Sequence, residues 1–84
     1  HNYLPNLFIF LDKYNNEVFK YNNINVGIIY RNYKDPKRKT ELDKIAKECR
    51  KKRFKLFVSN DVKLALKVKA NGVYIPSFNK TKRL

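Results

Sequence analysis

The sequence predicts a single α/β domain of parallel strands in the order β-α-β-α-β-α-β. Short apolar runs at residues 7–11, 26–30, 55–58 and 73–75 are typical of strands buried on both faces. A helix between two such strands implies a parallel pair with a right-handed crossover. Sequential crossovers place the strands in the order 1-2-3-4, with every helix on the same face. The chain has 84 residues, which is enough for one small domain.

The first two connecting segments differ in the strength of their helical pattern. Residues 13–25 are polar and rich in Asn, and Val18 and Phe19 could anchor one or two helical turns. The second segment opens with Asp35 as a cap and Pro36 at the first helical position, or later with a Thr40 and Asp43 capping pair. Its apolar positions fall on one helix face, namely Leu42, Ile45, Ala46 and Cys49. Cys49 is therefore expected to be a buried structural thiol. Phe54 is expected to fold back onto the sheet.

The last βα unit runs from Lys55 to Phe78. Ser59, Asn60 and Asp61 follow a strand, and each can cap the helix indicated by Leu64, Ala65 and Val68. Asn71-Gly72 is a natural left-handed helix stop before the fourth strand. Residues 79–84 are basic and without a pattern, so we expect a loose tail.

The net charge of +13 arises from 20 Lys and Arg against 7 Asp and Glu. Such an excess suggests nucleic acid, an anionic surface or phosphorylated ligands as partners. Compositional drift is the alternative, because the charge is spread over the whole chain, which is rich in Lys, Asn and Ile. The single Cys offers no disulfide or metal-ligand pair. With no apolar run near 18 residues, we expect no membrane span and a cytoplasmic location.

The segment S-N-D-V-K-L-A-L-K-V-K-A-N-G-V-Y-I resembles part of thiamine-phosphate synthase and its TenI relatives. In that family an Asn-Asp pair precedes a Leu-Ala-Leu helix, which leads into an Ala-Asp-Gly-Val-His strand. The resemblance covers roughly residues 8–78. It implies the amino-terminal half of a TIM (β/α)8 barrel, a single partial domain over residues 1–84. It also implies thiazole phosphate or pyrimidine pyrophosphate as ligand.

The second strand ends in I-I-Y-R-N-Y-K, which is similar to the family's Gln-Leu-Arg-x-Lys motif. Arg31 matches the motif's Arg, whereas Ile29 and Tyr33 stand at its Gln and Lys positions and Lys34 comes one residue late. The resemblance implies that Arg31 and Lys34 bind phosphate, because a guanidinium grips phosphate oxygens bidentately and an ammonium adds a point charge. A basic residue at a strand end also arises easily by chance in so basic a chain.

Asn60 and Asp61 match the family pair that meets pyrophosphate and magnesium. Carboxylate and carboxamide oxygens suit Mg²⁺, and Asp61 is the candidate metal ligand. The simpler interpretation is a helix cap, and the two roles can coexist. We expect Arg31, Asn60 and Ser77 to converge at the carboxyl ends of the strands, with Asp12 and Lys34 at the rim.

Departures from the family pattern at Ile29, Tyr33 and Tyr74, together with a missing acid, favour a divergent, TenI-like member that is inactive as an isolated fragment. Tyr74 stands where the family has His, and the second acidic magnesium ligand is missing after Ile75, so weak Mg²⁺ binding is expected. No residue is assigned a catalytic role. A small basic nucleic-acid-binding module is the alternative, since Tyr and Phe among Lys could stack on bases.

The second face of the predicted sheet has no predicted helix to cover it. Leaving its apolar side chains in water forfeits on the order of 10 kcal/mol. We therefore expect a homo-oligomer, or a carboxyl-terminal half, to cover this face. We expect the uncovered apolar side chains to come from one of two sets. They are either Phe8/Phe10, Val26/Ile28, Leu56/Val58 and Val73/Ile75, or the residues that alternate with these along the strands.

Overall fold

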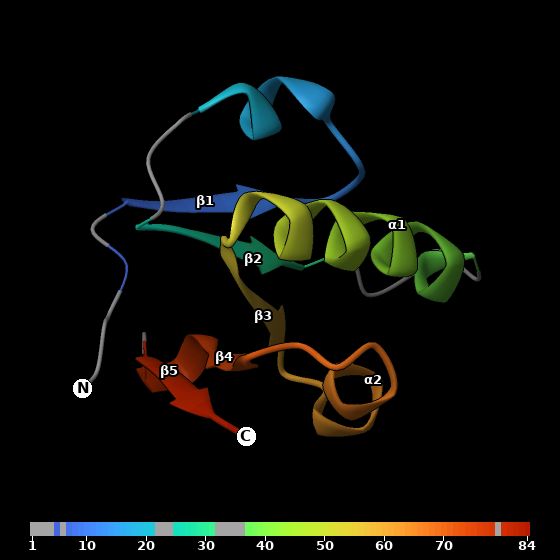
Figure 1. The fold of residues 1–84 in the computed structure, drawn as a ribbon. Coiled ribbons are helices and arrows are strands. Elements are labelled where there is room, and N and C mark those ends of the chain that lie inside the picture. Colours follow the sequence, from blue (N-terminus) through green and yellow to red (C-terminus); the bar gives the residue numbers. More distant parts are fainter. Residues whose placement is uncertain (1–4, 6, 22–24, 32–36, 79) are drawn as a thin grey trace.

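A five-stranded, mostly parallel sheet forms one layer of the molecule (Figure 1). The computed structural model describes residues 5, 7–21, 25–31, 37–78 and 80–84. The strands lie in sequence order, as β1 (Leu7–Leu11), β2 (Val26–Tyr30), β3 (Lys55–Ser59), β4 (Gly72–Ile75) and β5 (Lys80–Arg83). The first four pair in parallel, so the predicted α/β class and strand order are confirmed.

β5 corrects the prediction of a loose tail. Lys80–Arg83 pair antiparallel with β4, with Val73 opposite Lys82. The sequence K-T-K-R has no apolar pattern, because the side chains of this strand are mostly exposed and contribute little to the core. Its stabilisation comes from backbone pairing with the otherwise open edge of β4, and its charges are typical of a protected outer edge.

α1 spans Arg38–Lys52 and buries the predicted face. Leu42 and Ile45 are fully buried, and Ala46 and Cys49 lie beside them. Thr40 and Asp43 lie inside this helix, so the alternative capping pair is wrong, while Asp35 and Pro36 lie outside the described residues.

The carboxyl end of α1 turns the chain back onto the sheet. Arg53 closes the helix in the left-handed conformation, and the amide of Phe54 donates to the carbonyl of Cys49 (2.9 Å). Phe54 is buried, as predicted.

α2 spans Val62–Lys67 and starts at Asp61, whose Oδ1 accepts from the amide of Leu64 at 3.0 Å. The cap is one of the two roles predicted for Asp61, and it is confirmed. The left-handed stop is Lys69, with φ 59°, and not Asn71-Gly72. The helix ends early because the amide of Ala70 already turns back to the carbonyl of Ala65 (2.9 Å). Gly72 instead lies within β4.

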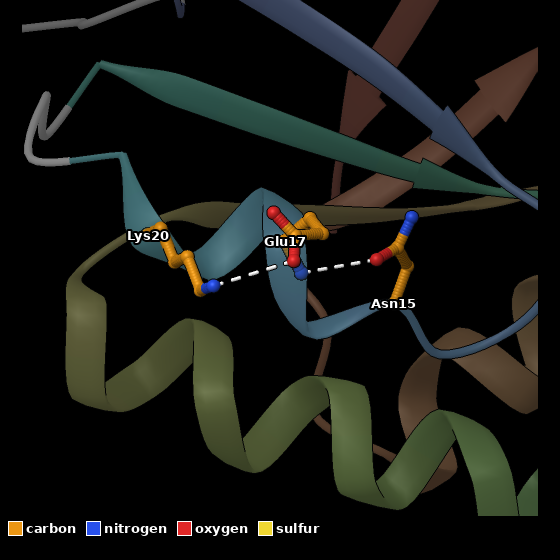
Figure 2. Close-up of polar contacts among 3 residues, drawn as sticks. All are labelled: Asn15, Glu17 and Lys20. Atoms are coloured by element: carbon orange, nitrogen blue, oxygen red, sulfur yellow. Dashed lines mark hydrogen bonds and ion pairs between the residues drawn. The ribbon is translucent and has the colours of Figure 1, made fainter.

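The segment between β1 and β2 contains the 3₁₀ helix η1 (Asn16–Lys20). Asn15 caps it by accepting from the amide of Glu17 (3.0 Å), and Lys20 pairs with Glu17 (3.3 Å) (Figure 2). Phe19 is buried and stacks between Tyr14 and Phe54, with ring centroids 5.8 and 5.9 Å away. Val18 and Phe19 therefore anchor this short helix to the core, as predicted.

The main core lies between one face of the sheet and η1, α1 and α2, which occupy the same side (Figure 1). The sheet contributes Leu11, Val26, Ile28, Tyr30, Leu56, Val58 and Val73 to this core. A second 3₁₀ turn, η2 (Pro76–Phe78), leads from β4 to β5.

The opposite face, here called the open face, carries the apolar and aromatic side chains of Phe8, Phe10, Ile29, Phe57 and Tyr74. The expected grouping of Phe8/Phe10 with Val26/Ile28 is wrong, because Phe8 pairs with Gly27 and Phe10 with Ile29. Side chains at paired positions of a parallel sheet share a face, so register assigns the phenylalanines to the side away from η1, α1 and α2.

Candidate anion site and the open face of the sheet

The four parallel strands all end at the same side of the sheet, here called the carboxyl edge because the carboxyl ends of the strands lie along it. Asp12 follows β1, Arg31 follows β2, Asn60 follows β3, and Ser77 lies in η2 just after β4. Function collects at this edge in parallel sheets, because loops there project past the ends of the strands. The structure places these four predicted residues on the same edge, while Lys34 lies outside the described residues.

Arg31 is held in position by two neighbours at the end of β1. Its Nε contacts Asp12 Oδ1 at 3.2 Å, and its guanidinium carbon lies 4.8 Å from the centroid of the Phe10 ring. The backbone amide of Arg31 donates to the carbonyl of Leu11 (2.9 Å). About half of the Arg31 side chain is solvent-accessible. A guanidinium bound through Nε retains its two terminal nitrogens as donors for a ligand.

The structure pairs Arg31 with Asp12 rather than with Asn60 or Ser77. The sequence places Asp12 at the rim of an anion site, and in the structure it neutralises part of the charge of Arg31. Because both side chains are exposed, this ion pair contributes about 1 kcal/mol or less. A phosphate with two negative charges can therefore compete with Asp12 for the guanidinium.

Asp61 uses both carboxylate oxygens within the protein. Oδ1 caps α2, and Oδ2 forms an ion pair with Nη2 of Arg38, the first residue of α1. Both side chains are about three-quarters buried. This pair links the start of α1 to the start of α2.

Sequence reasoning missed Arg38, since no spacing connects a helix-start arginine to a cap 23 residues away. A magnesium ion at Asp61 would have to displace these two partners. Among the residues that the structure describes, no three His, Cys, Asp or Glu side chains gather as metal ligands.

Asn60 shapes the turn that follows β3. It adopts the left-handed conformation, with φ 57°, and its amide donates to the carbonyl of Tyr74 (2.8 Å). Asn tolerates this conformation better than most residues, which explains its position between the strand and the capping Asp61. Its side chain is exposed, as is that of Ser77.

The aromatic side chains of the open face contact one another across several strands. The rings of Phe8 and Phe57 lie 6.1 Å apart, and those of Phe10 and Tyr74 lie 5.5 Å apart. Phe57 and Ile29 are only 4% and 2% exposed, while Phe8 and Phe10 remain 38% and 40% exposed. The open face is therefore less solvated than the sequence implies, although it retains an exposed aromatic surface.

Cys49 has the environment of a structural thiol. It lies on the buried face of α1, and burial raises its pKa from 9.0 to about 12. Because thiolates are the reactive species, this side chain is a poor nucleophile at neutral pH.

No protein-family model matches this sequence, and no curated protein or solved structure matches it significantly. In the described part of the chain, no helix has the length and apolar character needed to cross a membrane.

Proposed function

We propose that this chain binds a phosphorylated small molecule at the carboxyl edge of its parallel strands, with Arg31 as the principal ligand. The observation that carries the proposal is the position of Arg31, whose guanidinium is fixed by Phe10 and Asp12 while about half of the side chain stays exposed. A pre-positioned guanidinium loses little conformational entropy when it engages phosphate oxygens in a bidentate contact.

The ligand class follows from the resemblance to thiamine-phosphate synthase and TenI proteins. We propose a phosphorylated thiazole or a pyrimidine pyrophosphate, bound near Arg31 with Asn60 and Ser77 on the same edge. Magnesium is a weak part of this proposal, because the carboxylate of Asp61 is already bound to Leu64 and Arg38. We also propose that the protein is cytoplasmic.

The partial barrel is also a proposal, and the ring contact between β1 and β4 supports it. Neighbouring strands lie about 4.8 Å apart, so in a flat sheet strands three positions apart are separated by about 14 Å. The Phe10–Tyr74 centroid distance of 5.5 Å is much shorter than this backbone separation, which supports a sheet that curls toward its open face as the strands of a barrel do. A second copy or a carboxyl-terminal half would complete the interior, and we propose that the 84 residues alone catalyse no reaction.

Titration calorimetry with thiazole phosphate and with pyrophosphate tests the anion site. Arg31→Ala should weaken binding by roughly ten- to a hundredfold, since hydrogen bonds to charged groups contribute about 1.5–3 kcal/mol. Arg50→Ala, which removes an exposed arginine of α1, is the matched control for net charge and should bind as the wild type does. Equal affinities for wild type and Arg31→Ala would remove Arg31 from the site.

Asp12→Asn provides an independent test of the same geometry. It removes the carboxylate that competes with phosphate for the guanidinium, while Phe10 still supports the side chain. Anion affinity should rise several-fold, and the gain should disappear in the Asp12→Asn/Arg31→Ala double variant. A gain that persists in the double variant would locate the anion elsewhere on the protein.

A further inference from the structure

The open face combines exposed aromatic rings with a lack of cover from the described helices. Phe8 and Phe10 project from an edge strand and remain more than one-third exposed, with Phe57 and Tyr74 packed beside them. Partly exposed rings contribute less to stability than buried ones, because the favourable free energy of removing a phenyl ring from water is greatest when the ring is fully buried. A ligand with flat apolar faces would cover them.

Basic side chains lie on the same face as these rings or at its rim, whereas most of the described acidic side chains lie elsewhere. By strand alternation Lys55 lies on the same face as Phe57, and Arg83 lies there because it pairs with Gly72. Arg31 lies over Phe10 at the carboxyl edge. The described acidic residues other than Asp12 belong to η1, α1 and the cap of α2, namely Glu17, Glu41, Asp43, Glu48 and Asp61.

We propose that the open face binds single-stranded nucleic acid. The bases would stack on Phe8 and Phe10, and the phosphates would lie along the cations Arg31, Lys55 and Arg83. Aromatic platforms with basic rims bind single strands in this way, because every base presents a π-face and every nucleotide a negative charge. This goes beyond the small-molecule site, with which it shares Arg31, and does not depend on it. It is the alternative to covering the open face with a second copy or a carboxyl-terminal half.

The net charge of the protein favours a single-stranded nucleic acid over a second copy of the chain as the partner of the open face. Each copy has a net charge of +13, so two copies placed face to face would bring like charges together around the rings. A polyanion relieves that repulsion. A duplex satisfies only the cations, because its bases are already stacked and cannot reach the phenyl rings. The geometry therefore favours single strands over duplexes.

Fluorescence anisotropy with a labelled DNA strand of about 20 nucleotides, alone and annealed to its complement, tests the proposal. At roughly 100 mM salt the single strand should bind at least about tenfold more tightly than the duplex. Phe8→Leu and Phe10→Leu keep an apolar side chain but remove the stacking ring, and each should weaken single-strand binding about tenfold. Phe10→Tyr, which restores a ring, should bind as the wild type does.

Two controls separate stacking from charge and from folding. Leu66→Ala removes an exposed apolar side chain from α2, on the helical side, and should leave binding unchanged. Lys47→Ala on α1 should change it far less than Arg83→Ala. Circular dichroism confirms that each variant is folded before its affinity is compared.

Three results would overturn the proposal. Equal affinity for single strand and duplex would show that charge alone drives binding. Leucine variants that bind the single strand as tightly as wild type would remove the rings from the interface. Sedimentation of the free protein as a dimer that Phe8→Leu dissociates would assign the open face to a second copy.

Discussion

Phe10 of β1 and Tyr74 of β4 meet edge to face, with ring centroids 5.5 Å apart, although two strands separate β1 from β4. The two rings meet on the open face, the side of the sheet that the described helices leave uncovered. It also connects the two strand ends that carry the candidate site, since Arg31 lies over Phe10 and the Asn60 amide bonds to the carbonyl of Tyr74. The packing of the open face and the geometry of the candidate site are thus linked through these two rings.

The Phe10–Tyr74 contact should have a measurable coupling free energy. In a double-mutant cycle with Phe10→Leu and Tyr74→Leu, we expect the free energies of unfolding to be non-additive by about 0.5–1.5 kcal/mol. Chemical denaturation of the four proteins measures this coupling. Additive effects would mean that the rings do not interact in solution.

Gly72→Ala should dislodge β5. A Cβ at this position would lie 2.1 Å from the backbone carbonyl oxygen of Lys82, which no side-chain movement can relieve. We expect a loss of stability of about 1–3 kcal/mol, with large NMR shift changes confined to Lys80–Arg83 and the facing β4 residues.

Gly27→Ala is the comparison, because the atoms nearest to its added Cβ belong to the side chains of Pro5 and Phe8. Its effect on the amides of β5 should be negligible. Unchanged β5 signals in Gly72→Ala would contradict the antiparallel pairing.

Asp61 should stabilise the fold mainly as a cap, with the Arg38 ion pair as a smaller contribution. Asp61→Ala removes both interactions, and we expect a loss of about 1–2 kcal/mol. Asp61→Asn retains an oxygen that accepts from Leu64 but removes the charge, so its loss should be smaller. Thermal or chemical unfolding distinguishes the two variants. Equal losses would mean that the ion pair with Arg38 stabilises the fold more than the cap does.

Lys69→Gly should stabilise the protein, since Lys69 adopts the left-handed conformation at the end of α2. Glycine enters this region without the Cβ penalty, so we expect a gain of up to about 1 kcal/mol in the free energy of unfolding. Lys67→Gly, inside α2, should instead destabilise by about 1 kcal/mol. If chemical denaturation shows that both substitutions destabilise alike, Lys69 does not adopt the left-handed conformation after α2 in solution.

Cys49 should make stability depend on pH in the alkaline range. Its pKa is raised to about 12 by burial, so above pH 9 the unfolded chain releases the thiol proton while the folded chain keeps it. This contribution to the free energy of unfolding is full below pH 9 and is lost as pH rises from about 9 to 12. Chemical denaturation across this range should show a steeper decline for wild type than for Cys49→Ala. Parallel declines would mean that the thiol is solvated.

The sequence by itself determined the α/β class, the order of the four parallel strands and the buried face of α1. These features depend on local apolar runs and on the helical spacing of Leu42, Ile45, Ala46 and Cys49, which a single chain displays directly. It also placed Asp12, Arg31, Asn60 and Ser77 at strand ends, because parallel strands bring their carboxyl ends to one edge.

Only the tertiary structure decided which faces and partners these residues take. The register between β1 and β2 places Phe8 and Phe10 on the open face. A shift of one residue in this register would turn every side chain of the strand to the other face of the sheet. Backbone pairing, which leaves no apolar pattern, made a strand of Lys80–Arg83. The Arg38–Asp61 and Arg31–Asp12 pairs join residues that are distant in sequence, and only the packing of their elements brings opposite charges together.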